Sequence, residues 1–359
     1  MKDYLLQKLT IVIFSYNRHI YLKRSIKYWS SYNVKVIALD GSDIRLQDPC
    51  LNFKNIKYIH DPRSLYDRLL NSINYIDTDY MILGSDDEFY LPSALSSCIE
   101  FLTKEISFAS CGGRAIGFRS REQGKKIFGN EQYPKLRNLC LDQDDASKRA
   151  YKHFSNYAPA HIYSVMRTSK WKIICKHVFK KEYNFFAVWE LQIEFLVTIS
   201  GKSKIIPELM WLRSFDAKPI RMTNPVMSDE VKITYWWFNK KFKNEKKDFL
   251  NRMKKACNAL IIDQNLEYSY DIIVRPFEAY IQTIKSKETF LRKIRKHIPS
   301  KIKIFKRYLE QFMDKLKSSK YKSLAEEINL LEAEGVFVSH KDINKITSLL
   351  KNTNNKLKN

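Results

Sequence analysis

The chain has 359 residues, of which 44% are hydrophobic and 28% are charged, and its formal net charge at pH 7 is +24. This hydrophobic content suits one large domain or two and argues against a disordered chain. The six cysteines include no C-x-x-C pair and the seven histidines have no paired metal spacing, so a disulfide framework or a thiolate zinc site is not expected. The positive charge indicates a polyanionic partner: nucleic acid, anionic lipid or a phosphorylated substrate.

The sequence predicts no targeting or membrane-spanning segment. No apolar run approaches the ~18 residues that a membrane-spanning helix needs. The apolar run at residues 9–14 is too short for the core of a signal peptide, and "SYNR" follows it in place of a small-residue cleavage site. We therefore expect a cytoplasmic protein.

The first hundred residues alternate between short apolar runs and helical patterns. Runs rich in β-branched residues predict four strands, at 9–14, 34–39, 55–60 and 80–84. Between them, apolar residues recur at helical spacing over 21–32 and over 64–76, where Ser64 is placed to cap the second helix. Short strands that are apolar on both faces and alternate with helices are typical of a mainly parallel α/β sheet covered on both sides.

Polar segments follow the four predicted strands, where a parallel α/β sheet binds its ligands. They are "SYNR" (15–18), "DGSD" (40–43), "DPR" (61–63) and "SDDE" (85–88). The three consecutive acids of the last segment repel one another, so we expect a positive charge among them. Carboxylates at a strand end are ligands that Mg²⁺ or Mn²⁺ accepts while it also binds substrate phosphates. An exposed acidic turn is the simpler alternative, but "DGSD" at the same sheet edge favours a site.

The remaining chain divides into a mixed part and a helical part. Two helices and a strand are predicted at 93–105, 185–200 and 203–214. Residues 106–118 indicate strands broken at Gly112-Gly113, and the polar stretch 120–150 is interpreted as a surface loop. From Met222 onward the pattern is helical. We therefore predict two regions, residues 1–220 and residues 221–359.

Two groups of motifs resemble one enzyme family. "IVIFSYNR", "VIALDGS" and "DYMILGSDDEFYLPSAL" resemble the nucleotide-sugar half of family 2 glycosyltransferases, in particular a bacterial subgroup with "DGS" and an "ADDDFLLPSAL"-like segment. "VWELQIEFLVTISGKSKIIPELMWLRS" resembles the acidic helix of the same family, so the resemblance spans residues 8–214. It implies a GT-A fold, a Rossmann-like mixed sheet flanked by helices, with a C-terminal helical region added here. It also implies transfer of a sugar from a nucleoside diphosphate sugar to a glycan or lipid-linked acceptor, with inversion and with Mn²⁺ or Mg²⁺.

The resemblance assigns roles on the donor side of the site. Ser15 and Tyr16 would line the base pocket, and Asp40 would form a hydrogen bond with the nucleobase or the ribose. Asp86 would lie near the ribose or the sugar. Arg68, on the helix before the fourth strand, has roughly the position of the family's donor-side arginine.

The resemblance also assigns the metal ligand and the base. Asp87 would bind the cation, with Glu88 beside it. Glu190 would be the general base that deprotonates the acceptor hydroxyl as this oxygen attacks the anomeric carbon. Glu194 lies one turn along the same helical face and competes with Glu190 for that role.

Three departures from the family pattern keep other functions open. Ser85 stands where many members have an aspartate, and the paired acids of the family survive as Glu190 followed by Leu191. Of the Gln-x-x-Arg-Trp motif of processive members the chain keeps Arg213, which would hold the diphosphate or pair with Glu208. A nucleotidyltransferase on a related sheet is one alternative, weakened because no Gly-rich phosphate loop is present near the N-terminus. A catalytically inactive membrane- or polyanion-binding protein on a GT-A scaffold is the other.

The segment 285–316 is strongly basic and amphipathic. Ten Lys and Arg residues lie between positions 285 and 307, and apolar residues recur every three or four positions on both sides of Pro299. One interpretation is a helical subdomain packed on the catalytic domain. Another is a peripheral element on the inner face of the cell membrane, whose lysines contact anionic lipid while its apolar stripe enters the interface. Nucleic-acid binding is not expected, because no such motif or stacking array is visible.

Overall fold

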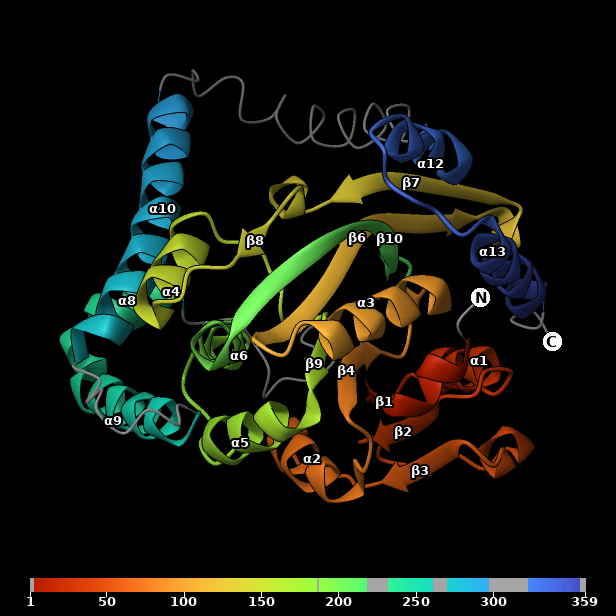
Figure 1. The fold of residues 1–359 in the computed structure, drawn as a ribbon, viewed down its shortest axis with the longest axis horizontal. Coiled ribbons are helices and arrows are strands. Elements are labelled where there is room, and N and C mark those ends of the chain that lie inside the picture. Colours follow the sequence, from red (N-terminus) through yellow and green to blue (C-terminus); the bar gives the residue numbers. More distant parts are fainter. Residues whose placement is uncertain (1–2, 186, 218–231, 261–269, 297–321, 356–359) are drawn as a thin grey trace.

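The structure of the protein is a computed structural model, which describes residues 3–185, 187–217, 232–260, 270–296 and 322–355. A mixed sheet runs through its centre with helices on both faces (Figure 1). The strand order along the sheet is β3-β2-β1-β4-β9-β6-β7-β11, and β10 pairs with β6 outside this path. The predicted α/β class, a mixed sheet flanked by helices, is confirmed.

Four parallel strands form one half of the sheet. They are β1 (Leu9–Ser15), β2 (Lys35–Asp40), β3 (Ile56–His60) and β4 (Tyr80–Ser85). All four were predicted, because a strand that helices cover on both faces is apolar along most of its length. Strand β1 pairs with both β2 and β4, so the carboxyl ends of these three strands are neighbours.

Helices connect and cover these strands. The α-helices of this part are α1 (His19–Trp29), α2 (Leu65–Ser72), α3 (Pro92–Lys104), α4 (Ala146–Ser155), α5 (Thr168–Val178) and α6 (Val188–Ser200). Short 3₁₀ helices lie at Asp3–Lys8, Pro49–Asn52, Ile73–Tyr75, Glu122–Gly124, Pro134–Leu136 and Lys240–Phe242. The predicted cap of α2 is confirmed, because the Ser64 side chain accepts a hydrogen bond from the Asp67 backbone N–H at 3.2 Å.

Strand β6 (Phe108–Arg121) is continuous, so the predicted break at Gly112-Gly113 is wrong. It pairs in parallel with β10 (Lys202–Ser214) and antiparallel with β7 (Lys126–Gln132) and β9 (Val165–Arg167). The two glycines permit close approach instead of a turn. A Cβ atom at Gly112 would lie 2.3 Å from the Ser164 hydroxyl, and one at Gly113 would lie 2.6 Å from the Glu208 carbonyl oxygen.

The surface loop predicted for 120–150 is also wrong, because this stretch holds β7, β8 (Cys140–Leu141) and the first half of α4. Strand β7 pairs with β6 on one side and with the short β11 (Lys322–Ser323) on the other. Its largely polar sequence reflects partial exposure, since half-covered strands need not be apolar on both faces. The start of α4 is capped by Asp145, which accepts hydrogen bonds from two backbone N–H groups.

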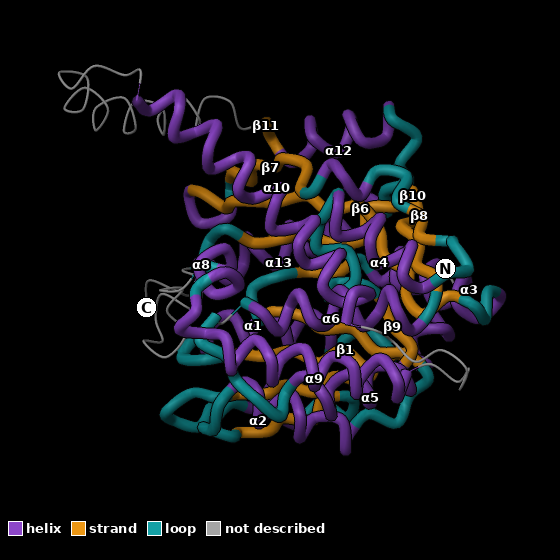
Figure 2. The backbone as a smooth tube through the Cα atoms, turned by 90° about the vertical axis from the view of Figure 1, so that its left-hand side faces the viewer, coloured by secondary structure: helices purple, strands orange, loops and turns teal. Residues whose placement is uncertain are grey.

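The C-terminal helices lie against both faces of the sheet. They are α8 (Ile233–Phe238), α9 (Lys243–Leu260), α10 (Tyr270–Lys296), α12 (Leu324–Ala333) and α13 (His340–Asn355). Helices α9 and α10 pack with α4, α5 and α6, while α12 lies on β7 and α13 lies beside α1 (Figures 1 and 2). The Phe277 ring of α10 contacts the rings of Phe154 and Phe195, at centroid distances of 5.0 and 5.7 Å. The division into 1–220 and 221–359 stays a prediction.

Most of the basic segment 285–316 lies outside the described residues, so its contact with a membrane surface stays a prediction. Helix α10 ends at Lys296, within this segment. Among the helices that the structure describes, none combines the length and the apolar character needed to cross a membrane.

Candidate active site

The strand ends that the sequence singled out meet in space. In the sheet register, Ser15 pairs with Asp40, and Phe14 pairs with Ser85. The Ser15 hydroxyl donates a hydrogen bond to the Asp86 carboxylate at 2.7 Å. Three of the four polar segments therefore form one edge of the sheet, as the parallel topology predicted.

The buried Asp40 carboxylate organises this edge. One oxygen accepts hydrogen bonds from the backbone N–H and the hydroxyl of Ser42, and the other is bonded to Tyr58 OH (2.7 Å) and His19 Nε2 (3.0 Å). Burial opposes ionisation, but the bonds from Ser42 and Tyr58 hold the pKa of Asp40 below its ordinary value. A nucleoside that contacts Asp40 would have to replace one of these hydrogen bonds. The bond to His19 is the accessible one, because 28% of the His19 side chain is exposed.

Arg68 lies buried directly beneath the "DGS" turn. Its Nη1 donates hydrogen bonds to the backbone oxygens of Ser15 (2.8 Å) and Leu39 (3.3 Å). A Cβ atom on Gly41 would lie 2.2 Å from the Arg68 guanidinium carbon. Burial lowers the pKa of Arg68, although the charges of Asp40 and Asp61 oppose this. Tyr16, the other residue assigned to the base pocket, is half-buried. Arg68 thus fixes the strand ends from below.

We expect Gly41→Ala to destabilise the protein by about 1–3 kcal/mol, because the methyl group overpacks against the buried guanidinium. Urea unfolding measures this loss. In an Arg68→Ala background the same substitution should cost less, since the clashing group is gone. An equal cost in both backgrounds would show that the Gly41–Arg68 contact is not the cause.

The positive charge expected among the three acids is Arg18, from the "SYNR" segment. Its guanidinium forms an ion pair with Asp86, and its Nη2 also lies 3.4 Å from Asp87 Oδ1. The Ser85 hydroxyl donates a hydrogen bond to the same Asp87 oxygen at 2.7 Å. Burial raises the pKa of Asp86 to about 7, and the charge of Asp87 adds to this while Arg18 opposes it. Arg18 and the hydrogen bond from Ser15 therefore favour the ionised form of Asp86 against the effect of burial.

Glu88 points away from the two aspartates towards aromatic residues. Its Oε2 accepts a hydrogen bond from Trp211 Nε1 at 3.0 Å, and Oε1 lies 4.0 Å from Arg213 Nε. Burial raises the pKa of Glu88 to about 8. Arg213 thus lies near Glu88 in this structure, where the sequence had offered Glu208 as a partner.

Because the pKa of Glu88 is raised, we expect Glu88→Gln to increase the stability of the protein, and to do so more at high pH. Between the ordinary pKa of a glutamate and about pH 8, the unfolded chain binds fewer protons than the folded one, so stability falls as pH rises. Glutamine removes this loss. We expect the variant to be more stable than the parent at pH 8 by about 1 kcal/mol or more, and similar to it at pH 5. Urea unfolding at the two pH values measures the difference, and a larger gain at pH 5 would contradict the assignment.

The residues fit a divalent cation held by one carboxylate. Asp87 lines the pocket described below, and its Oδ1 accepts a hydrogen bond from the Ser85 hydroxyl and lies 3.4 Å from Arg18 Nη2. Mg²⁺ and Mn²⁺ sites built from one or two carboxylates take their other ligands from phosphates and water. Glu88 accepts a hydrogen bond from Trp211, so Asp87 is the carboxylate that would hold the cation first. Both metal assignments stay predictions.

A pocket of about 560 Å³ opens beside these strand ends. Its acids are Asp87, Glu88 and Glu190, and its arginines are Arg18, Arg119 and Arg213. Asp87 follows β4, whereas Glu190 lies in the first turn of α6. The pocket therefore brings the predicted metal ligand and the predicted base to one cavity.

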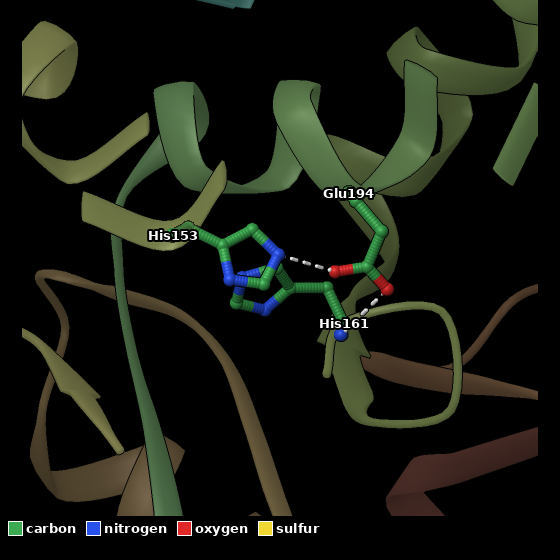
Figure 3. A group of neighbouring side chains, drawn as sticks. All are labelled: His153, His161 and Glu194. Carbon is green, nitrogen blue, oxygen red and sulfur yellow. Dashed lines mark hydrogen bonds and ion pairs between the residues drawn. The ribbon is translucent and has the colours of Figure 1, made fainter. Parts of the chain in front are cut away.

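Glu194, the competitor of Glu190, is fully buried and already bonded (Figure 3). It accepts hydrogen bonds from His153 Nε2 at 2.8 Å and from the backbone N–H groups of residues 160–162 at 2.9 to 3.3 Å. Burial opposes its ionisation, but His153 and these N–H groups hold the pKa of Glu194 below its ordinary value. Glu194 thus anchors a wall of the pocket, and Glu190 is the glutamate of this helix that lines it.

Comparison with known proteins identifies a family for part of the chain. Residues 10–159 match the model of the family described as glycosyl transferase family 2. The matched segment is a family 2 glycosyltransferase domain. Its mixed sheet and flanking helices are the GT-A fold that the resemblance implied, and the chain is a glycosyltransferase.

Solved structures of S. aureus TarS are similar to this glycosyltransferase at a distance. The structure of TarS residues 1–349 in complex with UDP-GlcNAc aligns with a TM-score of 0.43. A second structure of the same TarS segment aligns with a TM-score of 0.42. Both alignments have 9% identity and cover 78% of this chain and 91% of TarS 1–349. No curated protein sequence matches the chain.

Sequence reasoning missed several residues of the site. Arg18 was noted as an arginine after a strand, but its pairing with Asp86 depends on two strands meeting across 68 positions of sequence. Tyr58 and His19 were not assigned, although both bond to Asp40. Arg119 carried no signal, because it lies inside a strand whose neighbours were uncertain.

Proposed function

We propose that this glycosyltransferase moves a sugar from a nucleoside diphosphate donor to an acceptor hydroxyl in one displacement at the anomeric carbon. The observation that carries the proposal is that Asp87 and Glu190 line one pocket, although Asp87 belongs to the matched domain and Glu190 lies beyond it. A donor site and a base that face one cavity are what such a reaction needs.

The donor would lie across the carboxyl ends of β1, β2 and β4. Ser15, Tyr16 and Asp40 would contact the nucleoside, with Arg68 holding the turn beneath. Asp86, paired with Arg18, would face the ribose or the sugar. Asp87 would hold Mn²⁺ or Mg²⁺, which supplies positive charge to the leaving diphosphate when bound. Arg213 is a second source of positive charge at the pocket.

Glu190 would act on the acceptor. It takes the proton of the acceptor hydroxyl as the hydroxyl oxygen bonds to the anomeric carbon. The bond to the diphosphate breaks on the opposite side of that carbon, so the configuration inverts. Trp189 and Ile162 line the same pocket and contribute apolar walls around the reacting groups.

The proposed setting is synthesis of a bacterial surface polysaccharide, a capsule or a lipopolysaccharide, at the cytoplasmic face of the membrane. The charge distribution supports it, since residues 221–359 hold 30 of the 63 Lys and Arg residues and 16 of the 39 acids. Such a region suits peripheral contact with anionic lipid near a lipid-linked acceptor.

Thermal unfolding against UDP-, GDP-, CMP- and dTDP-sugars, with Mn²⁺, Mg²⁺ or EDTA, tests this function. A ligand that binds the native state raises its stability by about 2.7 kcal/mol at a hundredfold excess over Kd. We expect a shift with one nucleoside and with metal present. No shift with any donor would favour an inactive scaffold.

A further inference from the structure

One end of the pocket combines two arginines with aromatic rings. Arg119 is on β6 and Arg213 is on β10, which pair in parallel. Their guanidinium carbons lie 5.9 Å and 5.5 Å from the centre of the Phe215 ring, which directly follows β10. Tyr133 lines the pocket beside them. We call Arg119, Tyr133, Arg213 and Phe215 the arginine–aromatic end.

The position of Arg213 is fixed by stacking. Its guanidinium lies over the rings of Tyr133 and Trp211, at 5.5 and 5.8 Å from their centres. The Tyr133 ring lies nearly parallel to that of Trp211, at an interplanar angle of 14°, and Tyr163 stacks on Trp211 at 4.2 Å. Tyr133 has a φ of +54°, a left-handed conformation that a bulky residue adopts where its surroundings hold it there. The cation is therefore presented on a rigid platform.

The local charge is positive. Arg119 and Arg213 both line the pocket, and the carboxylate near them, Glu88, lies 4.0 Å from Arg213 Nε. Two guanidinium groups then flank one ring that is 38% exposed. An anionic group between them would form charge-assisted hydrogen bonds with both. The exposed part of Phe215 would contact the apolar C–H groups of a sugar ring, as aromatic side chains in ligand pockets do.

This end and the proposed base line one pocket. Glu190, Tyr163 and Arg213 are all part of its lining, and Tyr163 stacks on Trp211, over which the Arg213 guanidinium lies. An acceptor whose hydroxyl meets Glu190 would lay its neighbouring group on the arginine–aromatic end.

We propose that the arginine–aromatic end is the acceptor subsite and that the acceptor carries a phosphate or carboxylate group bound by Arg119 and Arg213 together. The inference rests on the proposed function. The shared chemistry, an anion on two arginines, has a second source in the diphosphate of the donor, so the experiment must separate the two.

Calorimetric titration of the full chain separates them. The nucleotide is first titrated into the parent, Arg119→Gln and Arg213→Gln. Each protein is then saturated with nucleotide and titrated with trigalacturonate, with glycerol phosphate, and with neutral maltotriose. Arg121→Gln is the matched control, because Arg121 is an exposed arginine on the same strand and does not line the pocket.

We expect an anionic probe to bind the nucleotide-loaded parent. Arg119→Gln should weaken the affinity for this probe by about tenfold and leave the affinity for nucleotide unchanged. Arg121→Gln should bind both ligands like the parent. Weaker nucleotide binding in both variants would assign the arginines to the donor diphosphate and overturn the proposal. Equal binding of maltotriose, an equal loss in Arg121→Gln, or no binding of any anionic probe would also overturn it. Failure of nucleotide to bind the parent would count against the proposed function instead.

Discussion

Glu190→Gln is expected to reduce sugar transfer by about 10²–10⁴-fold, the contribution of a general base, and to leave donor binding and stability unchanged. Glutamine keeps the size of the side chain but cannot take the proton of the acceptor hydroxyl. The measurement is release of nucleoside diphosphate under turnover conditions, together with calorimetric binding of the donor. Loss of donor binding in this variant would show that Glu190 acts in the donor site.

Glu194→Gln is the matched control, since it makes the same change one helical turn away. An amide there offers its NH₂ group to backbone N–H donors, which cannot bond to it. We expect a loss of stability of about 2–3 kcal/mol, because hydrogen bonds to a buried charged group are removed. Glu194 would be the base instead if Glu194→Gln were inactive but as stable as the parent while Glu190→Gln remained active.

Arg18→Met should lower the free energy of unfolding by about 1 kcal/mol more at pH 8 than at pH 5, because Asp86 ionises beside Arg18 in the parent above its pKa of about 7 and lacks this cationic partner in the variant. Without Arg18 the pKa of Asp86 rises further above about 7, so at pH 5 this carboxyl is neutral and needs no partner. Urea unfolding at the two pH values measures the difference.

Two further variants control for the charge change. Arg63→Met removes a largely exposed partner of Asp61, at 2.6 Å, and should change stability little. Adding Asp86→Asn to Arg18→Met should restore part of the loss, because both buried charges are then gone. If the double variant were less stable than Arg18→Met alone, the cost would not come from the unpaired Asp86.

The sequence was sufficient for the parallel half of the fold. Its four strands are short, apolar and rich in β-branched residues, and tertiary packing requires that pattern of any strand covered on both faces. The helices between them carry one apolar stripe and, in α2, a serine cap. Strand β7 could not be predicted in the same way, because its partial exposure removes the apolar signal. Gly112-Gly113 was misleading because a glycine marks close backbone approach as readily as a turn.

The site was predictable in outline for a similar reason. Parallel strands put their carboxyl ends at one edge, so Ser15, Asp40 and Asp86 could be grouped before their contacts were known. What each carboxylate bonds to could not be predicted, because Arg18 and Tyr58 reach these acids through tertiary contacts. Glu190 and Glu194 share a helical face, and which of them is buried depends on where residues 160–162 lie.

The most direct test of this account is calorimetric titration of the donor that stabilises the parent, with Mn²⁺ and with EDTA, into the parent and Asp87→Asn. Asp77→Asn serves as control, because Asp77 precedes β4 as Asp87 follows it and is exposed and paired with Lys35. We expect Asp87→Asn to weaken donor binding in Mn²⁺ by about tenfold or more and to abolish the effect of EDTA, while Asp77→Asn binds like the parent. Equal donor affinity in the parent and Asp87→Asn, with or without metal, would contradict it.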